Sequence, residues 1–392
     1  MRVRVCFHDQ CFDGACSAAL FTRFYRTCIN PEAMFDYRGL VHRAGQLFQA
    51  DFFDGDENAI VDFKYSSSDR LTWWFDHHQS AFLSEADAEH FRRDTGGRKF
   101  YGPEFRSCTK FLAHIGAAKF GFQADDLKEL VYWADVIDGA QYPDTQTAVE
   151  LRDPATQLTL VIEGTRTKDF VVSLIPELIS KPLQEIAALP HIRQAFEKLY
   201  AQHLKFMEII RSRAQLQDGV LYFDVSDLDA EGYNKFVPYY LFPGAVYSVA
   251  LSRSQERTKI AVGSNPWNPS PKTTNLATIC ERFGGGDTPK SRQFHCPLQT
   301  WSGGGRWPSK SLSSSGTRSA PEKQRGFTLA RLWAATTLEV LCGLRAAKAS
   351  TMTSGRCSVR SVSRVLIYRV HGAERPTRLT RLRDLAGSSA LW

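Results

Sequence analysis

The segment LTWWFDHHQSAF, Leu71 to Phe82, joins an apolar run to a carboxylate and two adjacent imidazoles. Its first half, rich in tryptophan and phenylalanine, is typical of a strand buried in a parallel sheet. Asp76, His77 and His78 follow at the point where such a strand would end. Because burying two imidazoles without partners is costly, this pair predicts a functional site at a strand end.

Two other apolar runs also lead into polar residues. VRVCF, residues 3–7, is followed by His8, and AIVDF, residues 59–63, contains Asp62. Segments with helical spacing separate these runs, which predicts an α/β domain. The carboxyl ends of parallel strands meet at one edge of a sheet, so we expect these polar side chains to lie together there.

A carboxylate-bearing helix is expected at residues 126–144. It places Asp135 and Asp138 about one turn apart, and the pattern leaves open which of them faces the site. Carboxylates and imidazoles suit Mn²⁺ or a similar divalent ion. Two such ions held by a bridging carboxylate can activate water and neutralise a phosphoryl group.

The charge of the chain is unevenly distributed. Residues 1–287 hold 31 Lys and Arg against 38 Asp and Glu, whereas residues 288–392 hold 18 against 4. The mildly acidic body argues against a broad phosphate-binding face. The chain has no run of about 18 apolar residues, so we expect no membrane span. Nine cysteines without a regular framework indicate reduced thiols and a cytoplasmic location.

Changes in pattern along the chain predict four parts. They are a metal-binding parallel-sheet domain at 1–170, a helical connector at 171–217, a smaller α/β domain at 218–287, and an irregular basic tail at 288–392. A disordered tail is the ordinary interpretation of the last part. The other hypothesis is a frameshift after Gly286. If one base was lost from the glycine codons, restoring it makes the chain read GGGGHPKV, followed by a strand-like run.

Taken in order, the motifs FHDQCFDG, VDF, FDHHQ, WADVIDG and ICERFGGG resemble those of the DHH phosphoesterase superfamily over about residues 1–287. The superfamily includes RecJ-type exonucleases, nanoRNases, cyclic-dinucleotide phosphodiesterases, exopolyphosphatases and family II pyrophosphatases. The resemblance implies a DHH domain followed by a DHH-associated substrate-binding domain, and two bound ions, Mn²⁺ first, with Mg²⁺ or Co²⁺ as alternatives.

The resemblance also implies roles for individual residues. The expected metal ligands are His8, Asp13, Asp62, His77 and Asp135, with Asp62 bridging the two ions. His78 is expected to face the scissile phosphate, and Asp76 to fix the orientation of an imidazole. Substrate contacts are expected from Arg106, Ser107, Gly284, Gly285 and Gly286. A cap at the start of a helix is an equally good interpretation of the segment that contains Arg106 and Ser107.

The first motif departs from the superfamily pattern. Many members have a second aspartate two positions after the first, where this chain has Ala15. Asp9 or Asp138 is a candidate for the missing carboxylate, and Cys11 is a further candidate in the same motif.

The predicted function is metal-dependent hydrolysis of phosphoester bonds in short oligonucleotides or small nucleotides by metal-bound hydroxide. A pyrophosphatase or exopolyphosphatase is the alternative among enzymes, and a nucleotide-binding or nucleic-acid-binding protein with a vestigial metal site is the alternative outside them. The acidic body weighs against an enzyme that tracks a long polymer. No membrane partner is expected, and a homodimer is left open.

Overall fold

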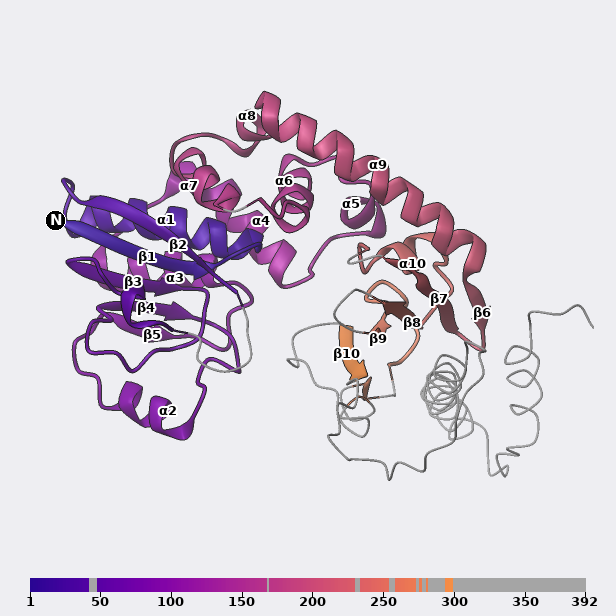
Figure 1. Cartoon of the computed structure of the whole chain (residues 1–392), viewed down its shortest axis with the longest axis horizontal. Coiled ribbons are helices and arrows are strands. Elements are labelled where there is room, and N and C mark those ends of the chain that lie inside the picture. The colour runs from indigo at the N-terminus through magenta and orange to yellow at the C-terminus, as the bar shows by residue number, and fades with distance from the viewer. Residues whose placement is uncertain are drawn as a thin grey trace, which may run out of the picture. The chain divides into compact units, whose positions relative to one another are not determined.

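A five-stranded parallel sheet forms the first part of the fold in the computed structural model (Figure 1). In spatial order its strands are β2 (Met34–Leu40), β1 (Arg2–His8), β3 (Glu57–Val61), β4 (Trp73–Asp76) and β5 (Lys99–Tyr101). All four pairings are parallel. The strands β1, β3 and β4 are therefore neighbours, and their carboxyl ends meet at one edge, as the sequence predicts.

The structure describes residues 1–41, 48–167, 169–229, 233–253, 258–272, 275, 276, 280 and 293–298. By its internal contacts the chain divides into residues 1–300 and 301–392. None of the helices within the described ranges is long and apolar enough to cross a membrane.

Strand β4 explains the paired tryptophans, because both of its faces are buried. Trp73 packs edge-on against Phe21 in the core on one face. Trp74 packs against Tyr65 and Phe91 on the opposite face. Both indole N–H groups donate hydrogen bonds, so these large side chains are buried without losing polar partners.

The helices in the described ranges are α1 (Phe12–Cys28), α2 (Glu85–Arg92), α3 (Cys108–Phe120), α4 (Lys128–Asp138), α5 (Thr145–Val149), α6 (Pro154–Gly164), α7 (Phe170–Ser180), α8 (Leu183–Ala187), α9 (Pro190–Arg213) and α10 (Val237–Leu241). Two short 3₁₀ helices are η1 (Ala50–Phe52) and η2 (Asp125–Leu127). Helix α1 contacts α3, α4 and α7, and residues of all four helices belong to the core on the Trp73 face.

The connector is helical, as predicted, and comprises α7, α8 and α9. Pro182 precedes α8 and Pro190 begins α9, whereas Pro176 lies inside α7. Helices α7 and α8 bury their apolar side chains in the core of the first sheet. The first half of the connector thus packs with the first sheet.

A second sheet has the order β10–β9–β8–β7–β6. Its strands are β6 (Gln215–Gln217), β7 (Val220–Asp229), β8 (Tyr247–Arg253), β9 (Thr258–Ser264) and β10 (Gln293–Leu298). The pair β7–β8 is parallel and the others are antiparallel.

Strand β10 corrects the expectation of an irregular chain from residue 288 onward, because it pairs with β9. The unpaired edge of a sheet offers backbone N–H and C=O groups to any extended segment, whatever its side chains.

Candidate metal centre

Most of the candidate ligands lie at the ends of three neighbouring strands, at one edge of the first sheet. His8 ends β1, Asp62 follows β3, and His77 and His78 follow β4. Within the described residues, three sets of ligand atoms lie within 4.8 Å of one another: His8–Cys11–Asp62, Asp62–His77–His78 and Asp13–His77–Asp138. Asp62 and His77 each belong to two sets, so the sets form one continuous centre.

Asp62 lies between the imidazoles of two strands. One of its carboxylate oxygens is 3.5 Å from Nδ1 of His8, and the other is 3.3 Å from Nε2 of His77. The residue is only 1% exposed, and its backbone is left-handed, with a φ of 57°. Its N–H donates to the Phe75 carbonyl at 2.9 Å, which fixes this unusual turn at the end of β3.

His77 is oriented by its other ring nitrogen. Its Nδ1 lies 3.2 Å from the Phe105 carbonyl, an acceptor that makes Nδ1 the protonated nitrogen. Its Nε2 then faces the carboxylates of Asp62, Asp138 and Asp13, at 3.3, 3.4 and 3.8 Å. A backbone acceptor on the far nitrogen is the arrangement that usually orients a histidine ligand.

The amino end of α3 positions Asp13. Its carboxylate accepts hydrogen bonds from the backbone N–H groups of Cys108 and Thr109, at 2.6 and 3.0 Å, and from the Thr109 hydroxyl at 2.5 Å. A carboxylate at the amino end of a helix is favoured by the helix dipole. Asp13 therefore joins α1 to α3 while it faces His77.

His78 is held by the aspartate that precedes the pair. Its Nδ1 lies 2.7 Å from Oδ1 of Asp76, and that oxygen also accepts from the backbone N–H of His77 at 2.8 Å. The Asp76 side chain is fully buried, whereas His78 is 25% exposed. The exposed part of the His78 ring is thus available to a substrate.

The structure brings Asp138, rather than Asp135, to His77. The Oδ2 of Asp135 forms an ion pair of 2.6 Å with Nζ of Lys110 on α3, so this carboxylate lies in the α3–α4 interface. Asp138, at the end of α4, joins Asp13 and His77 and is a candidate for the carboxylate missing at Ala15.

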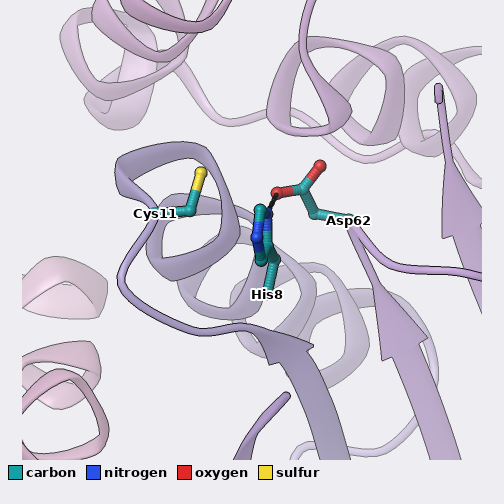
Figure 2. A group of neighbouring side chains, drawn as sticks. All are labelled: His8, Cys11 and Asp62. Carbon is teal, nitrogen blue, oxygen red and sulfur yellow. Dashed lines mark ion pairs between the residues drawn. The ribbon is translucent and has the colours of Figure 1, made fainter. Parts of the chain in front are cut away.

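The two remaining residues of the first motif differ in position. Asp9 accepts from the backbone N–H of Gln10 at 2.8 Å and is absent from the three ligand sets. Cys11 belongs to a set with His8 and Asp62 (Figure 2). Burial and the nearby carboxylate of Asp62 raise the pKa of Cys11 well above its usual value, so it is not an activated nucleophile.

The centre has an excess of negative charge. Burial, with Asp62 and Asp138 close by, raises the pKa of Asp13 well above its usual value. Burial alone would lower the pKa of His77, but its contacts with Asp62 and Asp138 raise it to about 10. The protonated ring of His77 therefore provides positive charge that a bound divalent cation would provide in its place.

The donor set fits a divalent ion. Two ligands of one ion, each bonded at about 2.1 Å, lie about 3.0–3.5 Å apart, which matches the contacts of Asp62 and His77. The two carboxylate oxygens of Asp62 and Nε2 of His77 are buried. Within the described residues, none of these atoms forms a hydrogen bond of ordinary geometry. Buried polar atoms without hydrogen bonds are rare, and metal coordination would satisfy them.

The expected substrate contacts have mixed outcomes. Ser107 is buried and caps α3, since its hydroxyl accepts from the Lys110 N–H at 3.2 Å. Arg106 is exposed and packs beside Gly139, next to Asp138, so it stays a candidate. The glycines at 284–286 lie outside the described residues. The backbone groups that hold Asp13 and His77 were missed, because no side-chain pattern marks them.

Comparisons with known proteins give a fold but no sequence relative. No model of a known protein family matches the chain, and a search of curated proteins finds no match. Among solved structures, the chain is similar to the pGpG-specific phosphodiesterase PggH from Vibrio cholerae, with 18% identity and a TM-score of 0.55 over 76% of this chain and 93% of that one. An exopolyphosphatase-related protein from Bacteroides fragilis matches with 12% identity and a TM-score of 0.48 over 88% and 93% of the two chains. The likeness to PggH shows a shared fold over most of both chains.

Proposed function

We propose that this chain is a divalent-metal-dependent phosphohydrolase that cleaves phosphoester bonds in short oligonucleotides or small nucleotides. The observation that carries the proposal is the buried carboxylate of Asp62. It contacts imidazoles from both neighbouring strands but forms no hydrogen bond of ordinary geometry within the described residues. Such a group suits a position between two cations.

The residues would divide between two ions, with Asp62 available to both. His8 would hold one ion, and His77, Asp13 and Asp138 the other. Mn²⁺ is the ion that we expect first, because imidazole and carboxylate donors both suit it. When bound, the ions supply charge neutralisation at the phosphate and a water acidic enough to attack phosphorus near neutral pH.

His78 serves the substrate rather than the ions in this proposal. The carboxylate of Asp76 binds Nδ1 and leaves Nε2 for the substrate, on a side chain that is 25% exposed. Burial alone would lower the pKa of His78, but its hydrogen bond to Asp76 raises it to about 9. The protonated ring can donate to a phosphate oxygen or protonate the leaving oxygen.

The substrate class rests on charge and on the fold. Residues 1–287 carry seven more acidic than basic side chains, which disfavours binding along a long polyanion. One solved structure with a similar fold is described as a pGpG-specific phosphodiesterase. A short nucleotide needs only a few phosphate contacts, such as those that His78 and Arg106 can supply.

The test is a substrate panel with the full-length chain and Mn²⁺: pApA, pGpG, phosphoadenosine phosphate, cyclic dinucleotides, pyrophosphate and polyphosphate. Hydrolysis of one or more of the nucleotides is expected, with loss of activity after chelation. Activity confined to pyrophosphate or polyphosphate would replace this substrate class with the inorganic one. Binding of a nucleotide without turnover would support the non-catalytic alternative.

A further inference from the structure

Cys11 is the member of the candidate metal centre to which the proposed function gives no role. It follows Gln10, whose φ of 55° turns the chain out of β1, and it occupies the N-cap position of α1. It is a free thiol, and its sulfur lies within 4.8 Å of ligand atoms of His8 and Asp62. In Figure 2 the His8 ring lies between the thiol and the carboxylate.

The backbone fixes this arrangement tightly. A Cβ on Gly14 would lie only 2.1 Å from the His8 carbonyl oxygen, so the first turn of α1 packs directly on the end of β1. The Cys11 carbonyl accepts from the Ala15 N–H at 3.1 Å, which begins the helix at this point. Cys11 therefore faces His8 through a short, well-determined turn.

Asp62 supplies an independent reason to place a ligand here. It is 1% exposed, and neither of its oxygens forms a hydrogen bond of ordinary geometry within the described residues. One oxygen faces the His8 side of the centre and the other faces His77. On the His77 side, Asp13 and Asp138 complete the donor set, whereas on the His8 side Cys11 is the third donor found.

We propose that the thiolate of Cys11 is a ligand of the divalent ion that His8 and Asp62 hold, which makes this half of the centre a nitrogen–oxygen–sulfur site. The proposal rests on the metal centre of the proposed function and specifies the chemistry of one of its two ions. Binding replaces the S–H bond with a metal–sulfur bond and releases the proton to solvent, so no oxidant or reductant is needed.

A thiolate changes which ions such a site prefers. Thiolate ligands favour soft and borderline ions such as Zn²⁺ and Co²⁺, whereas sites made only of carboxylates and water suit Mg²⁺. The His8 side should therefore discriminate against Mg²⁺ more strongly than the His77 side does.

The test uses the full-length chain, stripped of metal with a chelator and then titrated with Co²⁺. Equilibrium dialysis gives the amount of bound ion, and near-ultraviolet absorption reports the charge-transfer band of a cobalt–thiolate bond. The parent and Cys28→Ser should show the band, and Cys11→Ser should lose it. Cys28 is the matched control because it is a free, partly buried thiol at the opposite end of α1.

A second variant, Cys11→Asp, guards against misfolding of the serine variant by restoring a metal-binding side chain. It should bind Co²⁺ without the band. Its preference for Co²⁺ over Mg²⁺ should fall by at least about tenfold, because changes even outside the ligand shell alter metal affinity by about 10–100-fold.

Each contrary outcome has a distinct meaning. Bound Co²⁺ without the band in the parent would overturn the thiolate ligand and leave the proposed function intact. A band that persists in Cys11→Ser or Cys11→Asp would assign the sulfur to another cysteine and overturn the inference. Failure of the parent to bind any ion would overturn both the inference and the proposed function.

Discussion

At the residue scale, Asp62 combines three costly features. It is a non-glycine residue with a left-handed backbone, its carboxylate is buried, and its oxygens lack ordinary hydrogen bonds within the described residues. An unfavourable backbone conformation costs about 1–3 kcal/mol and persists only where the surrounding structure imposes it. Here the pairing of β3 with β1 and β4 imposes it, and the result is a carboxylate aimed at two imidazoles.

Asp138 and Asp135 give a matched test of the proposed second ion site. We predict that Asp138→Asn weakens Mn²⁺ binding about tenfold or more, because it removes a charged donor from the set with His77. Asp135→Asn should leave Mn²⁺ affinity close to that of the parent, because Lys110 binds that carboxylate. Isothermal titration calorimetry with both variants decides the matter, and the reverse order of effects would place Asp135 in the site.

His78 should separate turnover from metal binding. We predict that His78→Ala lowers kcat about 10²–10³-fold, as expected when a transition-state donor is removed, and leaves Mn²⁺ affinity nearly unchanged. Asp76→Asn should give a smaller loss, because the ring stays but its orientation and charge are less well fixed. Parallel loss of metal binding in His78→Ala would instead make His78 a ligand.

The sequence predicted which types of residue form the candidate site better than it predicted which individual residue takes each position. His8, Asp62 and His77 were predicted from strand ends, because parallel strands bring those ends together. The spacing of Asp135 and Asp138 could not decide between them, since the choice depends on how α4 packs against α3 and on the position of Lys110. The sequence left Ser107 open between a helix cap and a substrate contact, and in the structure its hydroxyl caps α3.

At the element scale, the contact between β1 and α1 determines the geometry of the first motif. We predict that Gly14→Ala destabilises the chain by about 1–3 kcal/mol, the usual cost of overpacking, since the added methyl group would meet the His8 backbone at 2.1 Å. Gly96→Ala is the control, because its Cβ would meet only Asp94 at 3.6 Å. Urea denaturation measures both, and equal stabilities would show that α1 can move away from β1.

Helix α9 should respond to acid through His203. Its Nε2 lies 2.8 Å from the Val149 carbonyl, and burial lowers the pKa of His203 below its usual value. As the pH falls through about 6.5, the unfolded chain gains a proton that the folded chain resists, so stability is lost at a rate of up to about 1.4 kcal/mol per pH unit. Denaturation curves at pH 7.5 and 5.5 should show a larger loss for the parent than for His203→Gln.

The control for this acid effect is His191→Gln, since His191 is exposed on the same helix. That variant should keep the pH dependence of the parent. An unchanged pH dependence in His203→Gln would place the sensitivity elsewhere, for instance among the carboxylates and imidazoles of the metal centre.

The elements themselves were largely predictable, and the exceptions have physical causes. Both faces of β4 are buried, so its apolar sequence identified it directly. Strand β10 was missed because its pairing depends on the free edge of β9 and not on its own side-chain pattern. Pro176 lies inside α7, and the helix continues past it and buries Ile175 and Leu178 on either side.

At the scale of the whole molecule, the balance of charge changes abruptly near Gly286. The body has more acidic than basic residues, and the last 105 residues have a basic excess of 14. Segments with such composition rarely contribute to a packed domain. The change coincides with the end of a glycine-rich motif that, in the superfamily pattern, would continue to a histidine.

We therefore predict one additional base in the glycine codons of the gene, and sequencing of source DNA across the codons for Cys280 to Cys296 tests this. The restored frame reads GGGGHPKV, and it would supply a histidine to the expected substrate-binding domain. A verified frame that encodes Asp287 would contradict the frameshift and make the +14 segment genuine. Truncation at Gly286 should then flatten the salt dependence of nucleic-acid binding, because fewer counterions would be released from the phosphates.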